Sequence, residues 1–321
     1  MSSDAIVELD RITKRFAGHT AVRELSLTVP RGSVYGLLGP NGAGKSTTIR
    51  MIMGVLLPDS GRVSLFGGRE NGRTMSHRIG YLPEERGLYK KMRVADLLVF
   101  LAEIKGVSRP AARTAAAEWL ERLGLGDWAT KRAEALSRGM QQKVQFIATV
   151  LHRPDLLILD EPFSGLDPVN SQVLKDTVVE LARNGATILF STHIMEQAEK
   201  LCDAVCIIAR GEKLVDGALS EVKRRHGGSH VIVAVERDQA AADAIFADRR
   251  LVASADRFGN YAEVALAAGA DPQHLLERLV QAGARITRFE IAEPTLNKIF
   301  LDLVGPEAAR AAAMPDGPDH A

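Results

Sequence analysis

The sequence predicts an α/β fold built on a parallel sheet, and two observations carry that prediction. The first is a short apolar run, 33–38, which ends in a glycine-rich turn and passes directly into a segment of helical periodicity, 45–53. The second is a pair of further apolar runs, 156–159 and 187–190, each preceded by a segment with a helical pattern. Strands that alternate with helices indicate a parallel sheet covered on both faces.

Two stretches depart from this alternation. Near the N-terminus, 6–9 and 25–29 alternate between apolar and polar residues and have turn residues between them, which predicts an antiparallel β subdomain. The stretch 95–136 is rich in alanine and poor in β-branched residues, and it predicts an inserted helical subdomain. We expect one domain over residues 1–225 that contains these parts and the parallel-sheet core.

A second, smaller domain is predicted after a basic, glycine-containing linker at 223–229. The patterns beyond the linker predict, in order, strand, helix, strand, helix and strand: 230–236, 239–247, 262–266, 272–281 and 285–291. We expect an α+β accessory domain over 229–305, which either stabilises packing or a dimer, or senses a ligand. The tail, 306–321, is predicted to be disordered.

The composition excludes several classes of protein. The formal net charge is +1, so no global field draws the chain to nucleic acid, and we expect no nucleic-acid partner. No apolar run approaches the roughly 18 to 20 residues needed to cross a bilayer, and the first residues lack the apolar core of a secretory signal. Cys202 and Cys206 are predicted to be small apolar residues of a buried strand rather than half of a metal site.

The glycine-rich turn carries the strongest single signal for function. Nine consecutive residues fit the phosphate-binding pattern G-x-x-x-x-G-K-[ST] with a second hydroxyl: Gly39, Pro40, Asn41, Gly42, Ala43, Gly44, Lys45, Ser46 and Thr47. Glycines let backbone N–H groups converge on phosphate oxygens, and the helix that follows favours the same anion. Lys45 is placed to bridge the β- and γ-phosphates of ATP, and Ser46 offers a hydroxyl to Mg²⁺. A chance match in a glycine-containing turn is the alternative, and it leaves the flanking strand and helix unexplained.

Polar side chains follow the other two apolar runs of the predicted sheet. Asp160 is expected to hold the Mg²⁺ shell, and Glu161 to polarise the attacking water as a general base. A solvated acidic turn that caps the next helix is the alternative. His193 closes the segment 190–193 that follows the run 187–190, and a lone histidine is more often structural than catalytic. Because it ends a second strand of the same sheet, a γ-phosphate-sensing role is favoured here, which makes Lys45, Glu161 and His193 the predicted catalytic set.

The segment 136–143 begins another helix, ahead of the run 156–159, and phosphate-loop enzymes in general do not need such a segment. With six other segments in order, it makes the chain resemble the ATP-binding subunit of an ABC transporter over about residues 4–220. The seven segments, in chain order, are Phe16, 39–47, 80–84, 136–141, 156–161, 164–167 and His193.

The resemblance implies a head-to-tail dimer, expected to be of identical chains, with two ATP molecules between them. In such a dimer Ser137 and Gly139 contact the γ-phosphate that the other chain holds, and Asp167 couples the two sites across the interface. Phe16 stacks on the adenine, with a place in the core as the alternative. Arg138 and Met140 stand where the family usually has glycine and glutamine, and this departure leaves the phosphate contact in place.

A second departure is Glu84, which stands where the family usually carries a glutamine that touches Mg²⁺ and the membrane partner. We expect Glu84 to keep the coupling role and to add a negative charge to the metal shell. The expected metal-binding residues are therefore Ser46, Asp160 and Glu84. The segments 81–89, 140–143 and 293–300 also resemble a bacterial sodium-export-type subgroup.

The expected function is that of an ATP-binding and ATP-hydrolysing subunit that energises a separate integral membrane permease. We expect a peripheral protein on the cytoplasmic face of the cell membrane, serving an exporter of sodium or of another small solute or drug. One alternative is a soluble ABC ATPase acting on ribosomes or DNA, which usually has two ATP-binding units or a long coiled-coil insert. Another is a regulatory module without hydrolysis, which the presence of Glu161 and His193 argues against.

Overall fold

The computed structural model describes residues 5–68, 72–85, 87–226, 230–236, 239–267 and 269–305. The chain forms two compact units, one that ends at Ala218 and one that runs from Leu219 to Gly305. The division lies ahead of α7 (Leu219–His226), a helix that the sequence patterns place in the first domain. The predicted disordered tail, 306–321, lies outside the described residues.

The core of the first unit is a six-stranded sheet with the strand order β5-β6-β7-β3-β8-β9. Its strands are β3 (Val34–Leu38), β5 (Ile79–Leu82), β6 (Leu156–Asp160), β7 (Thr187–Thr192), β8 (Ala204–Ala209) and β9 (Glu212–Ala218). All neighbouring pairs are parallel except β8 and β9. Every residue of β3, β6 and β7 is buried, which explains their uninterrupted apolar runs and confirms the predicted parallel core.

The register of the parallel strands brings their carboxyl ends together. Leu38, the last residue of β3, pairs with Thr192 of β7, and Asp160 of β6 pairs with Ser191. The groups that follow these three strands therefore meet at one edge of the sheet, where open α/β sheets bind ligands.

A three-stranded antiparallel sheet forms the β subdomain, in the order β2-β1-β4. It consists of β1 (Ala5–Phe16), β2 (His19–Pro30) and β4 (Ser60–Leu65), and it shares an apolar core with α1 (Lys45–Ile52). The first two strands are longer than predicted. The third has no counterpart among the predicted strands because only Leu65 is buried, so β4 shows no apolar alternation.

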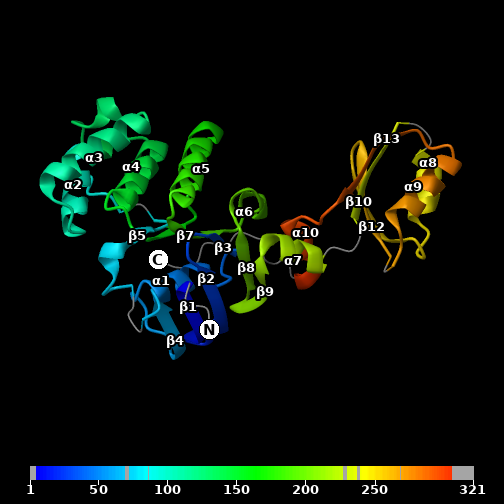
Figure 1. Cartoon of the computed structure of the whole chain (residues 1–321), viewed down its shortest axis with the longest axis horizontal. Helices are drawn as coiled ribbons and strands as arrows, with labels where there is room; N and C mark the ends of the chain where they lie inside the picture. The colour runs from blue at the N-terminus through cyan, green and yellow to red at the C-terminus, as the bar shows by residue number, and fades with distance from the viewer. Residues whose placement is uncertain are drawn as a thin grey trace. The chain divides into compact units, whose positions relative to one another are not determined.

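Helices complete the first unit: α2 (Val94–Ile104), α3 (Arg109–Arg122), α4 (Arg138–Val150), α5 (Pro168–Arg183) and α6 (Met195–Leu201). The helices α2, α3 and α4 contact one another and form the helical part, which Figure 1 shows at the opposite side of this unit from β1, β2 and β4. Single 3₁₀ turns lie at Ser76–Arg78, Gly126–Trp128 and Ala133–Ala135.

The second unit is an antiparallel sheet with helices on one face, in agreement with the predicted α+β type. Its strand order is β11-β12-β10-β13, and α8 and α9 pack on the sheet around a separate apolar core. Besides α7, its elements are β10 (His230–Val235), α8 (Gln239–Phe246), β11 (Val252–Phe258), β12 (Tyr261–Leu266), α9 (Pro272–Gln281), β13 (Ile286–Ala292) and α10 (Leu296–Val304). The strand β11 and the helix α10 are additions to the predicted order.

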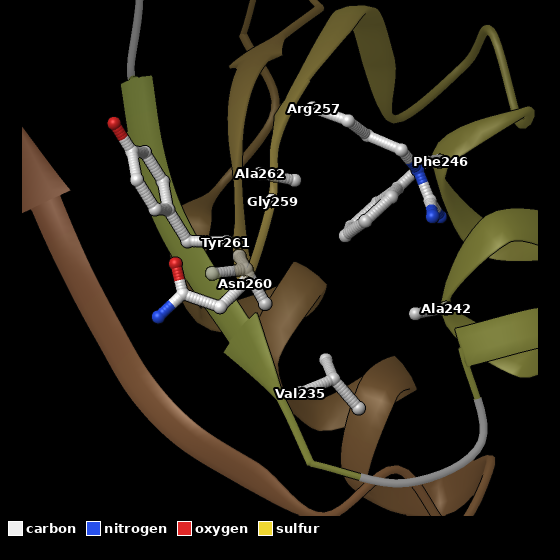
Figure 2. A pocket seen from close by; sticks show the side chains of 9 residues that line it. Val235, Ala242, Phe246, Arg257, Gly259, Asn260, Tyr261 and Ala262 are labelled. Carbon is white, nitrogen blue, oxygen red and sulfur yellow. The ribbon is translucent and has the colours of Figure 1, made fainter.

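A small cavity lies between α8 and the sheet of the second unit (Figure 2), and Phe246 reaches into it from the helix. Its volume is about 30 Å³, which is space for roughly one water molecule. This cavity therefore gives no support to a ligand-sensing role for the unit.

Candidate nucleotide site

The phosphate loop lies between β3 and α1, and two of its glycines are required by the surrounding backbone. A Cβ on Gly44, whose φ is +104°, would lie 2.4 Å from the carbonyl oxygen of Ala21. A Cβ on Gly39 would lie 2.2 Å from the carbonyl oxygen of Ile208. Gly44 caps α1 without any side-chain hydrogen bond, so the first N–H groups of the helix remain available to an anion.

Lys45 begins α1 and is buried with only 6% of its surface exposed. Its Nζ donates hydrogen bonds to Gly39 O at 2.7 Å and to Pro40 O at 3.1 Å. It also lies 3.8 Å from Glu161 Oε1. Burial lowers the pKa of Lys45, and the nearby carboxylates of Glu161 and Asp160 oppose that shift. The loop thus holds a desolvated cation at its centre.

The two predicted carboxylates, Asp160 and Glu161, accept hydrogen bonds from residues at the end of β7. The Ser191 hydroxyl donates to Asp160 Oδ1, and both residues are buried. Glu161 Oε1 accepts the backbone N–H of His193 at 3.0 Å and lies 2.9 Å from His193 Nδ1. Because a carboxylate only accepts, the proton of this second bond belongs to Nδ1.

Glu161 has an uncommon backbone conformation. Its φ is +46°, in the left-handed region that residues with a side chain rarely adopt. Such strain persists where the surrounding structure fixes it, and it is common at functional sites. Here the Glu161 N–H is fixed by a hydrogen bond to Ser191 O at 3.1 Å, which turns the carboxylate toward Lys45 and His193.

A cavity of about 490 Å³ gathers most of the predicted nucleotide-binding residues. It is lined by Phe16, His19, Ala21, Asn41, Gly42, Ala43, Gly44, Lys45, Ser46, Thr47, Glu84 and Glu161. Phe16 is 47% exposed, so the alternative that it belongs to the core does not hold. His19 was not singled out from the sequence. It faces Phe16 across the β1–β2 turn, so recognising the hairpin at Ala17–Gly18 would have found it.

Glu84 follows β5 and lines the same cavity. Burial raises the pKa of its carboxyl, and the charges of Asp160 and Glu161 raise it further. The carboxylates of Glu84 and Asp160 and the hydroxyl of Ser46 offer oxygen ligands alone. Mg²⁺ prefers oxygen ligands and usually keeps several waters as well. The described residues contain no cluster of three or more His, Cys, Asp or Glu side chains that holds a metal by itself.

Seven predicted site residues do not line the cavity. Four of them belong to the phosphate loop or lie at the ends of β6 and β7: Gly39, Pro40, Asp160 and His193. The other three lie at two helix starts. Ser137 caps α4 and accepts the N–H of Met140 at 3.3 Å. Asp167 caps α5 and accepts the N–H of Asn170 at 3.0 Å, which lowers its pKa. Gly139 lies beside the second cap, because a Cβ on it would meet Leu166 at 3.5 Å. Ser137 and Asp167 are exposed, so both helix starts face outward.

Comparison with known proteins now decides the family. Residues 22–164 match a family model described as ABC transporter, and residues 217–304 match one described as ATP-binding protein DrrA1-3-like, C-terminal domain. An uncharacterized ABC transporter ATP-binding protein of Bacillus subtilis (strain 168), YhaQ, is 43% identical over 305 residues, which is 94% of this chain and 99% of YhaQ. The chain belongs to the ATP-binding subunits of ABC transporters.

Other members of this family agree with that assignment. Nod factor export ATP-binding protein I of Burkholderia orbicola (strain AU 1054) is 34% identical and covers 95% of this chain and 99% of its own length. A solved structure of the ATP binding subunit of an ABC transporter has a TM-score of 0.64 and 31% identity, and covers 68% of this chain and 92% of that chain.

The predicted fold class, ATP hydrolysis and the role of energising a membrane permease are confirmed at the level of this family. The alternative of a soluble ABC ATPase gains no support from these relatives. Within the described residues, no helix has both the length and the apolarity to cross a membrane.

Proposed function

We propose that two identical copies of this chain close head-to-tail on two molecules of ATP with Mg²⁺ and thereby drive an exporter-type permease. One observation carries this proposal. Ser137, Gly139 and Asp167 do not line the cavity that contains the phosphate loop. They lie instead at two helix starts that face outward. A helix start is a good anion site, so the second half of each ATP site is supplied by the other chain.

Within one chain, the residues of the cavity and Asp160 beside it have roles that their positions support. Phe16 stacks on the adenine, and Lys45 with residues 39–47 holds the phosphates. Ser46, Asp160 and Glu84 would hold Mg²⁺. When bound, Mg²⁺ neutralises part of the phosphate charge and fixes the geometry of the phosphate oxygens.

Glu161 is the proposed general base, and its two oxygens differ. Oε1 is bound by His193 through two groups, whereas among the described residues Oε2 accepts a single long contact of 3.3 Å from the Thr192 hydroxyl. Oε2 is therefore the oxygen that takes a proton from the attacking water. The ring of His193 turns from Glu161 to the γ-phosphate when ATP is present, while its backbone N–H stays on Oε1.

The permease is proposed to dock beside Glu84. The loop after β5 and the helix α2 expose three large apolar side chains, Tyr89, Phe100 and Ile104. The rings of Tyr89 and Phe100 meet edge to face with centroids 6.0 Å apart. Exposed apolar side chains near a ligand-binding loop are typical of a protein interface.

Export as the direction of transport is supported by the relative named for Nod factor export. A docked permease places the chain on the cytoplasmic face of the membrane as a peripheral subunit. The unit Leu219–Gly305 is proposed to be an accessory domain of this subunit. Sodium as the transported species remains a prediction from the sequence.

Glu161→Gln tests the proposal. The substitution keeps the shape of the side chain and removes the base, so ATP binding is spared and hydrolysis slows by about a hundredfold or more. The trapped ATP then holds two chains together. Light scattering on a sizing column, with ATP and Mg²⁺, is expected to show a dimer for the variant, with ADP as the control. A variant that turns over normally or stays monomeric would contradict the proposal.

A further inference from the structure

The facing ends of β6 and β7 contain a buried group that the proposed mechanism does not use. Ser191 is fully buried and pairs directly with Asp160 in the parallel register of the two strands. Its Oγ donates a hydrogen bond to Asp160 Oδ1. Polar groups that bind a metal-ligating side chain commonly fix the orientation of that ligand.

The direction of the Ser191 hydrogen bond is set by its other neighbour. The backbone N–H of Glu161 points at Ser191 Oγ over 3.4 Å and at Ser191 O over 3.1 Å. An N–H group only donates, and an ionised carboxylate only accepts. The hydroxyl therefore accepts from Glu161 and commits its single proton to Asp160.

This arrangement leaves the two oxygens of Asp160 in different situations. Oδ1 is occupied by the serine, whereas Oδ2 accepts no hydrogen bond from any residue of the part of the chain that the structure describes. Asp160 is 3% exposed, so few water molecules reach it. A buried carboxylate that is held by one oxygen presents the other oxygen in a single orientation.

Residues at the end of β7 also form hydrogen bonds to the neighbouring carboxylate, that of Glu161. The hydroxyl of Thr192 and the backbone and ring of His193 all bind Glu161. Three consecutive residues at the end of β7 thus orient two consecutive carboxylates at the end of β6. Of these three residues, Ser191 alone contacts the carboxylate assigned to the metal.

We propose that Ser191 is a positioning residue that locks Asp160 by Oδ1 and so presents Oδ2 to Mg²⁺. The inference rests on the proposed role of Asp160 as a metal ligand. It adds that the Mg²⁺ affinity of the site depends on a hydroxyl that touches neither nucleotide nor metal.

Calorimetric titration of the full chain with a non-hydrolysable ATP analogue, repeated over a series of MgCl₂ concentrations, tests this inference. Ser191→Ala removes only the hydroxyl. The MgCl₂ concentration needed for half of the Mg²⁺ effect is expected to rise about tenfold, the scale for loss of a group that orients a metal ligand. The affinity for the analogue without Mg²⁺ is expected to stay unchanged, because the phosphate loop is intact.

Thr187→Val is the matched control. Thr187 is also fully buried on β7, and its Oγ1 accepts the N–H of Gly32 at 2.9 Å, at the far end of the strand. This variant is expected to lose melting temperature and to keep the MgCl₂ midpoint. An equal shift of the midpoint in Thr187→Val would show a general effect of lost stability and overturn the inference.

Asp160→Asn separates this inference from the function on which it rests. If Asp160→Asn raises the MgCl₂ midpoint and Ser191→Ala leaves it as in the unsubstituted chain, Ser191 does not position the ligand, while the proposed site stands. If Asp160→Asn leaves the midpoint unchanged, the metal role of Asp160 is wrong and the inference falls with it.

Discussion

Two glycines at helix starts, Gly44 before α1 and Gly139 in α4, have very different surroundings. A Cβ on Gly44 would lie 2.4 Å from a backbone oxygen, and its φ of +104° excludes most side chains. A Cβ on Gly139 would meet Leu166 at 3.5 Å, an ordinary contact, within a helical backbone. The fold of this chain requires the first glycine and not the second. The contacts of the phosphate loop are therefore made within one chain. The start of α4 has room at Gly139, where a group from outside the chain can approach.

The largest effect is expected from Gly44→Ala. The new Cβ collides with the carbonyl oxygen of Ala21 and the residue is held in a left-handed conformation, so the variant loses at least about 2 kcal/mol of stability and all measurable ATP binding. Calorimetric ATP titration and thermal unfolding measure both losses. Lys45→Ala is the matched variant, because it is expected to abolish ATP binding as well while leaving the fold intact. A Gly44→Ala chain as stable as the unsubstituted chain would break the comparison.

Gly139→Ala is expected to act in the opposite sense on stability. Glycine in a helix costs up to about 1 kcal/mol relative to alanine, so the variant gains melting temperature. Binding of ATP to the single chain is unchanged, while hydrolysis falls about tenfold or more, because a methyl group blocks the approach of the γ-phosphate to backbone N–H groups. ATPase assays and thermal unfolding on one preparation test this. Full activity in the stabilised variant would show that nothing approaches Gly139.

Glu84→Gln gives an intermediate effect that depends on pH. Burial and the charges of Asp160 and Glu161 raise the pKa of Glu84, so its ionised form destabilises the fold at neutral pH. The variant is therefore more stable at pH 7. The gain shrinks as the pH falls through the raised pKa, and it vanishes below the ordinary glutamate value of about 4.3, where Glu84 is protonated in both states. Thermal unfolding across this range checks the sign, and a gain that grows on acidification would contradict it.

The smallest effect is expected at the second helix start. Asp167→Ala removes the cap that accepts the Asn170 N–H, and a modest loss of melting temperature follows at neutral pH. Asp167→Asn keeps a capping oxygen and so keeps the melting temperature. Because Asp167 is also the proposed link between the two sites, both variants are expected to lose cooperativity in ATP hydrolysis. Normal cooperativity in Asp167→Asn would reduce this residue to a helix cap.

The sequence allowed prediction of the elements whose signals are local. The phosphate loop is a run of consecutive residues whose types are set by one turn, and β3, β6 and β7 are apolar throughout because both faces are buried. The placement of Glu161 and His193 at one edge of the sheet followed from the parallel arrangement, because strands that end together bring their next residues together.

Other features depend on contacts that no local pattern encodes. The left-handed φ of Glu161 and the hydrogen bond from Ser191 to Asp160 arise from the exact register of β6 against β7. The strand β11 has mostly exposed or half-buried residues, so its alternation is weak. By contrast, α10 had a readable signal in the cap Thr295 and the apolar spacing of Leu296, Ile299 and Phe300.

The central claim is that each ATP site is shared between two chains, and a mixing experiment tests it most directly. Chains with Lys45→Ala and chains with Gly139→Val are each expected to be inactive alone, since both sites of either homodimer are damaged. In an equal mixture, a head-to-tail dimer of one chain of each kind has one intact site. ATPase activity is then expected to return to at most about a quarter of the unsubstituted level, because half of the dimers are mixed and each has one working site of two. A mixture that remains as inactive as its components would contradict the shared site.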